Sequence, residues 1–329
     1  MRFPQGSFYN MDAIAGCIKH IEDESVDLII TDPPYGIEGG TLHRHYNRDE
    51  DFVIDGYVEV PIDKYGDFSL QWVKQAERIL RPGGQIYIVS GYTNLFHIMS
   101  ALRQTELKEL NHIIWKYNFG VFTRRKFVSS HYHILYYYKP GGDRVFNLTA
   151  RYGLEERDEQ GKSLNYQDRE DVWVINREYK PGKAKNKNEL PVKLLVKMMQ
   201  YSSNQGDLVC DLFMGGFSTA VVAAGLNRGF VGFEISEPVF RHGVECIRKI
   251  EKGFLLPSLR NPLIDNRLRN QGKRWSQSEV RELLEKYKTY SEQGITKKKI
   301  IEMLGQEYGR GRFSITNVIR KYGSSAQDE

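Results

Sequence analysis

Short apolar runs alternate along the chain with longer stretches in which apolar residues recur every three or four positions. The short runs are rich in Val, Ile, Leu and Tyr, and they predict strands at 26–31, 85–90, 111–116, 131–139, 207–213 and 230–233. The periodic stretches predict helices at 68–80, 191–201 and 218–225. A stop and a turn are expected at Arg81-Pro82-Gly83-Gly84. Strands that alternate with helices are typical of an α/β fold with a doubly wound, mostly parallel, Rossmann-like sheet.

Two parts of the chain lack this alternation. Residues 141–187 are polar and weakly periodic, and a long irregular insertion in a compact domain is commonly functional. Residues 257–272 have the composition of a linker. We therefore expect one large domain at 1–256 and a small all-α C-terminal domain at 273–329.

The last part of the chain carries the net positive charge. The whole chain has a net charge of +5, and residues 260–329 hold 15 Lys and Arg against 9 Asp and Glu, so the basic excess lies there. Three short helices are expected in this part. Ser276-x-x-Glu279 forms a capping box that begins the first, Gly305 ends the second and Ser314 caps the third.

Composition excludes several classes of protein. Hydrophobic residues make up 40% of the chain and charged residues 27%, as in ordinary globular proteins. No apolar run approaches the roughly 20 residues that span a bilayer, and the N-terminus has no secretory signal. The three cysteines are widely spaced and odd in number, so neither a disulfide framework nor a zinc site is expected. A cytoplasmic location is the resulting expectation.

A candidate catalytic tetrapeptide, Asp32-Pro33-Pro34-Tyr35, directly follows the strand predicted at 26–31. These residue types suit a reaction in which an exocyclic aromatic amine attacks a methyl group. Such an amine is a poor nucleophile because its lone pair is delocalised into the ring. Two acceptors, the Asp32 carboxylate and the Pro33 carbonyl, would favour its pyramidal form and the positive charge that develops on it. Tyr35 can stack on the target ring. The simpler interpretation is a strand end followed by a Pro-Pro turn.

A candidate cofactor loop comes much later in the chain. It joins a predicted strand to a predicted helix, and glycines there allow close approach of a ligand to the backbone. Glu234 lies 19 positions after Gly215, a spacing suited to binding ribose hydroxyls. Such a turn can also serve only to pack a helix on a strand. The candidate ligand contacts are Asp211, Phe213, Gly215, Gly216, Ser218, Thr219 and Glu234.

The order of these two motifs resembles the permuted β class of DNA amino-methyltransferases, in particular its N6-adenine type. The resemblance covers roughly residues 7–250 and implies S-adenosylmethionine as cofactor, with Asp12 at the cofactor's adenine. It also implies that 141–187 is the target-recognition region and that the strand at 131–139 lies near the target base. The glycine loop is similar to the family's Asp-Pro-Phe-x-Gly-Ser-Gly-Thr-Thr pattern. Phe217 departs from that pattern at a small-residue position, which leaves the path of the loop open.

Several basic residues are candidates for contact with double-stranded DNA, because arginine and lysine bind phosphates and guanine edges. A solvated surface role is the alternative for each. The last predicted helix, with Trp275 upstream, looks like part of a helix-turn-helix or Myb-like module; dimerisation or packing is its alternative. The candidates are Arg124, Arg125, Lys126, Arg144, Arg151, Arg320 and Lys321.

Together with the motifs, the resemblance implies a sequence-specific DNA methyltransferase that modifies N6 of a flipped adenine and needs no metal. N4-cytosine methylation is the nearest alternative, and Asp at the first motif position favours adenine by resemblance. A catalytically silent DNA-binding regulator is a second alternative, against which the intact Asp32 and Glu234 argue. A homodimer and a cognate restriction endonuclease are possible partners.

Overall fold

The computed structural model describes most of the chain and divides it into two compact units, Met1–Pro262 and Leu263–Glu329. Each unit is described by itself. The described residues are 2–3, 6–34, 60–118, 124–177, 189–262, 270 and 273–323. No helix within these ranges is long and apolar enough to cross a membrane.

The first unit is built on a nine-stranded sheet, formed by described residues in the order β1-β2-β9-β8-β3-β4-β6-β5-β7. Strands β2, β9, β8, β3 and β4 are parallel to one another, whereas β6 is antiparallel to both of its neighbours. The bounds are β1 (Arg2–Phe3), β2 (Gly6–Asn10), β3 (Val26–Thr31), β4 (Leu80–Ser90), β5 (Lys108–Lys116), β6 (His131–Tyr138), β7 (Val172–Val174), β8 (Leu208–Asp211) and β9 (Gly229–Glu234).

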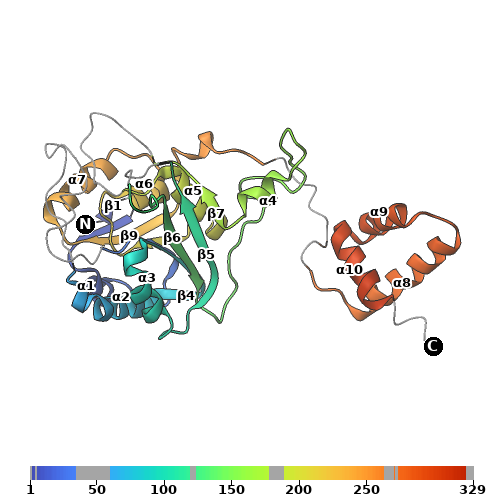
Figure 1. Cartoon of the computed structure of the whole chain (residues 1–329), viewed down its shortest axis with the longest axis horizontal. Helices are drawn as coiled ribbons and strands as arrows, with labels where there is room; N and C mark the ends of the chain where they lie inside the picture. Colours follow the sequence, from blue (N-terminus) through green and yellow to red (C-terminus); the bar gives the residue numbers. More distant parts are fainter. Residues whose placement is uncertain are drawn as a thin grey trace. The chain divides into compact units, whose positions relative to one another are not determined.

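Helices cover both faces of this sheet, so the expected α/β, doubly wound, mostly parallel architecture is confirmed (Figure 1). One face packs against α1 (Ala13–His20), α2 (Tyr65–Ile79), which follows the short helix η3 (Ile62–Lys64), and α3 (Tyr92–Leu102). The other face packs against α5 (Val192–Ser202), α6 (Ser218–Gly225) and α7 (Glu237–Ile247), and η4 (Leu256–Ser258) follows them. Each face has its own apolar core, which holds the strands in register.

The turn predicted at Arg81-Pro82-Gly83-Gly84 is wrong, because these residues belong to β4. The strand begins irregularly, with a register shift opposite β3 between Val26 and Leu28. Gly83 has a φ of 80° and lies against the backbone of Asp143, where a β-carbon would be 2.2 Å from the carbonyl oxygen. Glycine is therefore required for a close backbone approach at this position.

The polar segment at 141–187 contributes regular structure to the first unit. It contains α4 (Leu164–Asp168) and β7, and β7 pairs in parallel with β5 at the edge of the sheet. Residues 178–187 lie outside the described residues. The described part of this insertion is thus continuous with the sheet and does not stand apart as a separate module.

The second unit is a three-helix domain, α8 (Gln277–Glu292), α9 (Lys297–Tyr308) and α10 (Arg312–Tyr322), around a small apolar core. The predicted capping box of Ser276 and Glu279 is present. Two expected helix ends are wrong. Gly305 lies inside α9, which ends instead at Gly309 with a φ of 58°. Gly311, not Ser314, precedes α10, and the Ser314 hydroxyl accepts a hydrogen bond from Trp275.

Candidate functional site

The two motifs meet at the carboxyl edge of the sheet. Strand β3 lies between β8 and β4, so the strand order reverses at β3: β4 lies on one side of it, and β8 and β9 lie on the other. Ligands of open α/β sheets bind at such a switch point. Thr31 ends β3 and Asp211 ends β8, and the Thr31 hydroxyl donates a hydrogen bond of 3.1 Å to Asp211 Oδ1. The structure therefore places Asp32 next to the predicted cofactor loop, although 179 positions separate Asp32 from Asp211 in the sequence.

Asp32 presents an unsatisfied acceptor. Its Oδ1 is buried and has no hydrogen-bond partner among the residues that the structure describes. Burial raises the pKa of Asp32 well above its usual value, and the nearby charge of Asp211 raises it further, whereas Arg177 lowers it. A buried polar atom without a partner is costly in free energy. This oxygen is suited to accept a hydrogen bond from a ligand's N–H group.

The Pro33-Pro34 segment is held from helix α2. Tyr65 Oη donates a hydrogen bond of 2.8 Å to the Pro34 carbonyl, and the Tyr65 side chain is completely buried. Burial raises the pKa of Tyr65, so its hydroxyl remains a donor. Asn94 of α3 lies beside Tyr65 and is also buried. Tyr35, the fourth member of the predicted tetrapeptide, lies outside the described residues.

The buried carboxylate of Asp211 accepts hydrogen bonds from the glycine loop. Its carboxylate accepts hydrogen bonds from the Thr219 hydroxyl at 2.7 Å and from the backbone N–H of Phe213 at 3.0 Å, in addition to the bond from Thr31. Burial raises the pKa of Asp211 to about 6, and these hydrogen bonds act in the opposite direction. Asp211 and Thr219 thus fix the path of the loop through bonds within the protein.

Glu234 and Asp12 lie at the carboxyl ends of two paired strands, β9 and β2. Strand β9 ends at Glu234, whose carboxylate accepts hydrogen bonds from the backbone N–H groups of Gly215 at 2.9 Å and Ser236 at 2.7 Å. Asn10 of β2 is paired with Glu234, and Asp12 follows it as the exposed N-cap of α1. The carboxyl ends of β2 and β9 therefore bring these two carboxylates to one edge.

The loop keeps a sharp turn in spite of the departure at Phe217. Gly215 and Phe217 both have positive φ angles, 47° and 64°. A left-handed conformation is unfavourable for phenylalanine. The buried Phe217 ring packs on Phe8 and Phe240, and this burial compensates for the strain. At Gly216 a β-carbon would lie 2.3 Å from Glu189 Oε1, so a side chain there would displace Glu189.

An arginine beside Asp32 is enclosed by aromatic rings, and the sequence did not single it out from the other insertion arginines. The Arg177 guanidinium lies 5.7 Å from the ring centroid of Trp115, 4.9 Å from that of Tyr117 and 5.1 Å from that of Tyr132. Its Nε is buried and has no hydrogen-bond partner among the described residues. Arg177 follows β7, whereas the rings come from β5, β6 and the residue after β5. Only the fold brings these groups together.

The candidate DNA contacts fall into distinct environments. Arg124, Arg125 and Lys126 are exposed in the connection between β5 and β6, and Arg144 is exposed before the insertion helix. Arg151 is different, because it forms an ion pair of 2.9 Å with Asp168. In the second unit, two exposed basic residues lie in the last turn of α10: Arg320 and Lys321.

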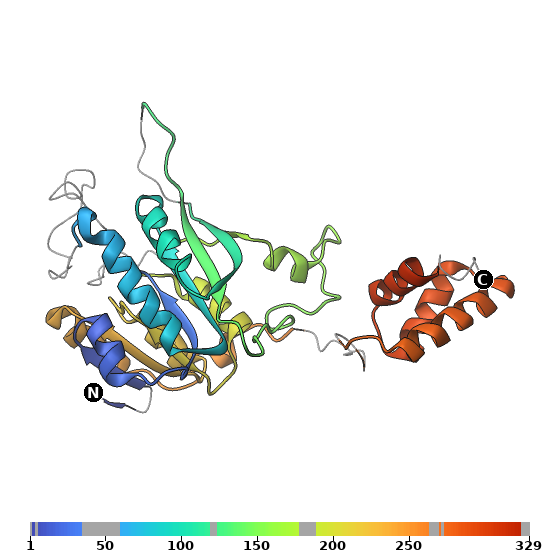
Figure 2. The same cartoon turned by 90° about the horizontal axis from the view of Figure 1, so that it is seen from below.

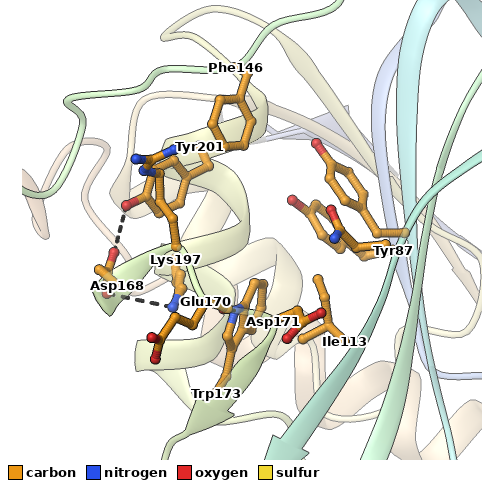
Figure 3. Close-up of a pocket in the computed structure, with 12 residues that line it drawn as sticks. Tyr87, Ile113, Phe146, Asp168, Glu170, Asp171, Trp173, Lys197 and Tyr201 are labelled. Atoms are coloured by element: carbon orange, nitrogen blue, oxygen red, sulfur yellow. Dashed lines mark hydrogen bonds and ion pairs between the residues drawn. The ribbon is translucent and has the colours of Figure 1, made fainter. Parts of the chain in front are cut away.

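Asp168 anchors the insertion to helix α5 (Figure 3). Besides the bond to Arg151, it accepts a hydrogen bond of 2.6 Å from Tyr201 and lies 3.5 Å from Lys197 Nζ. Lys197 also lies over the Trp173 ring at 4.4 Å. Burial lowers the pKa of Lys197 to about 8, and Asp168 partly offsets this. Asp168, Lys197, Tyr201 and Trp173 line a small pocket.

Comparison with known proteins identifies relatives of the first unit. Residues 26–245 match the family model N6_N4_Mtase, DNA methylase. Type II methyltransferase M.HpaI of Haemophilus parainfluenzae is 28% identical over 240 residues, 72% of this chain and 73% of the relative. Type II methyltransferase M.BamHI of Bacillus amyloliquefaciens is 28% identical over 243 residues, 70% of this chain and 54% of the relative. The chain therefore spans about half the length of M.BamHI.

A solved structure has the same fold. TTHA0409, a putative DNA modification methylase from Thermus thermophilus in complex with S-adenosyl-L-methionine, matches with a TM-score of 0.53 and 23% identity. The match covers 74% of this chain and 93% of that one.

Proposed function

The chain belongs to the DNA methylase family, and we propose that it is a sequence-specific methyltransferase that modifies N6 of adenine in double-stranded DNA with S-adenosylmethionine as cofactor. The observation that carries this proposal is the buried Oδ1 of Asp32, which has no hydrogen-bond partner among the described residues and lies at the switch point of the sheet. Methyl transfer to an aromatic amine needs an acceptor of this kind.

In this mechanism Asp32 and Pro33 act on the amine of a base that has left the duplex. The Asp32 carboxylate accepts a hydrogen bond from one N–H group and the Pro33 carbonyl accepts one from the other. These bonds strengthen as the nitrogen becomes positively charged, so they stabilise the transition state more than the ground state. Tyr65 holds the Pro34 carbonyl and so fixes the direction of the Pro-Pro segment.

The cofactor supplies an electrophilic methyl group when it is bound. The residues present fit such a ligand, because the loop at Gly215 and Gly216 lacks side chains and Glu234 is oriented by two backbone N–H groups. Glu234 suits ribose hydroxyls and Asp12 suits the adenine amine. The residues proposed to surround the cofactor are Asp12, Phe213, Gly215, Gly216, Ser218 and Glu234, with Asp211 and Thr219 shaping the loop.

Adenine is proposed over cytosine as the target base because an aspartate at the first position of the tetrapeptide, Asp32, resembles the N6-adenine type of the family. The amine chemistry serves N4 of cytosine equally well, and the matched family's name includes both N6 and N4. To decide between them, the protein is incubated with methyl-labelled S-adenosylmethionine and unmethylated duplex DNA of mixed sequence, and the modified nucleosides are identified. We expect N6-methyladenine. N4-methylcytosine would overturn the choice of base, and absence of transfer would favour a silent DNA-binding protein.

The same proposal includes DNA binding by the insertion and by the C-terminal unit. Exposed cations support it: Arg144 in the insertion and Arg320 and Lys321 in the C-terminal unit. The connection between β5 and β6 adds three more in the first unit, Arg124, Arg125 and Lys126. Two relatives are named Type II methyltransferases, which supports a role beside a cognate restriction endonuclease. Mapping methylated positions in the genome of an expressing host reports the base and its sequence context together.

A further inference from the structure

The connection between β5 and β6 exposes a phenylalanine among cations. Phe127 is 98% exposed, more than the other large apolar side chains in the described part of the chain. Arg124, Arg125 and Lys126 precede it directly and are exposed as well. An isolated exposed aromatic ring is common in proteins, but a fully exposed ring that follows three consecutive cations has the composition of a nucleic-acid contact.

Strand pairing places this connection at the same edge of the sheet as Asp32. Thr31 at the end of β3 is paired with Ile88 of β4, and Ser90 at the end of β4 is paired with His133 of β6. Lys116 and His131 form the last pair between β5 and β6. The chain therefore leaves β5 and enters β6 at the carboxyl edge, and the described residues of the connection extend beyond the strands (Figure 2).

We propose that Phe127 enters the base stack of the duplex as the target base leaves it, while Arg124, Arg125 and Lys126 bind the adjoining phosphates. This inference rests on the proposed function. Removing a base from the duplex breaks its stacking and pairing, and an apolar ring inserted between base steps replaces part of the lost stacking. The cations fix the position of the ring through contacts that are independent of sequence.

The local charge favours DNA over a protein partner for this surface. Residues 124–130 contain three cations and no acidic side chain, so the ring lies in a positive field that attracts a polyanion. Binding of a second protein to Phe127 would instead be detected as an oligomer or complex that forms without DNA.

The test compares Phe127→Ala and Phe127→Trp with the unchanged protein on a duplex that carries a methylation site mapped as described above. In Phe127→Ala, kcat/KM for methyl transfer should fall about tenfold to a hundredfold, the range expected for loss of one stacked ring. Phe127→Trp should retain most of the activity. Ile18→Ala, at another exposed apolar residue on α1, serves as the matched control and should be unchanged.

A second duplex distinguishes insertion of Phe127 into the base stack from an ordinary surface contact. When the target base is mispaired, its removal from the stack costs less, so the defect of Phe127→Ala should shrink. The variant Arg124→Gln/Arg125→Gln should lose affinity in a salt-dependent way, and mispairing should not restore it. Equal activity of Phe127→Ala and the unchanged protein on the paired duplex would overturn the inference, as would a defect that mispairing does not reduce. Absence of methyl transfer by the unchanged protein would instead refute the proposed function.

Discussion

The Thr31 hydroxyl donates a hydrogen bond to Asp211 across the boundary between the two strands whose ends carry the two motifs. The segment that begins at Asp32 and the glycine loop that begins at Asp211 are thus linked through a side-chain contact. The proximity of Asp211 also raises the pKa of Asp32, because two carboxylates in a buried setting repel each other.

Replacing Asp32 tests the assignment of the acceptor. Asp32→Asn keeps the size of the side chain but removes the charge, so it weakens the bonds that stabilise the developing positive charge. We expect kcat to fall about 100-fold to 1,000-fold, while titration calorimetry with S-adenosylmethionine gives an affinity close to that of the unchanged protein. Unreduced turnover in Asp32→Asn would refute the role given to this carboxylate.

The pH dependence of turnover should follow the ionisation of Asp32. Because burial raises the pKa of this carboxyl group, the active carboxylate is lost at higher pH than for an ordinary aspartate, and kcat/KM should rise as pH increases through the raised pKa. Arg177 lowers that pKa. Arg177→Gln should therefore move the midpoint of the profile to higher pH, whereas Arg177→Lys should move it less. A midpoint that is the same in all three proteins would contradict the electrostatic role of Arg177.

The buried Lys197 should make stability depend on pH. Its pKa is about 8 in the folded protein and 10.5 in an unfolded chain, so above pH 8 the unfolded state binds more protons. The free energy of unfolding from this group should therefore rise with pH, by about 2 kcal/mol between pH 8 and 10. Urea denaturation at several pH values measures this rise. In Lys197→Met the rise should be absent, and an identical slope would show that Lys197 does not titrate as expected.

Phe217 and Gly243 should behave as a coupled pair. Phe217→Gly relieves the positive φ but removes a buried ring, for a net loss of about 2–4 kcal/mol in the free energy of unfolding. A β-carbon at position 243 would lie 2.1 Å from Phe217 Cδ2, so Gly243→Ala should destabilise the unchanged protein. In the Phe217→Gly background the same change should be neutral or stabilising. Additive effects in the double variant would contradict the packing described.

The two cations at the end of α10 test the role of the C-terminal unit. Replacing Arg320 and Lys321 by glutamine should weaken DNA binding and reduce the slope of log affinity against log salt by about 2, if each contacts one phosphate. Lys298 and Lys299 on α9 offer a control with the same loss of charge. Fluorescence anisotropy with a labelled duplex at several salt concentrations provides the measurement. An unchanged slope would favour a dimerisation or packing role for this unit.

The elements predicted correctly are those whose secondary structure is determined by residues that are adjacent in the sequence. The Val26–Thr31 run is buried and β-branched, and β3 has the predicted bounds. The helix end at Gly305 failed because glycine is tolerated inside a helix when packing requires it: a β-carbon there would be 3.1 Å from the Arg310 carbonyl. Periodicity also missed β7, which is only three residues long. Its strand character comes from pairing with β5.

The candidate site likewise contains residues that the sequence identifies and groups that only the fold brings together. Residue types and spacing are sufficient to propose Asp32 and Glu234 as site residues. The aromatic enclosure of Arg177 is not visible in the sequence, because its members are distant in the chain and meet only when β5, β6 and β7 are side by side. Nor can a sequence reveal that Asp32 Oδ1 lacks a partner, since that depends on what surrounds it.

The pairing of β7 with β5 has a consequence for exchanging the polar segment at 141–187 between related proteins. An exchange of the insertion alone would remove an edge strand together with Asp168, which pairs with Lys197 of the recipient's α5. A graft bounded inside the polar segment would leave that lysine buried without its counter-ion. A viable chimera would need to carry β7, α4 and matching α5 positions as one cassette.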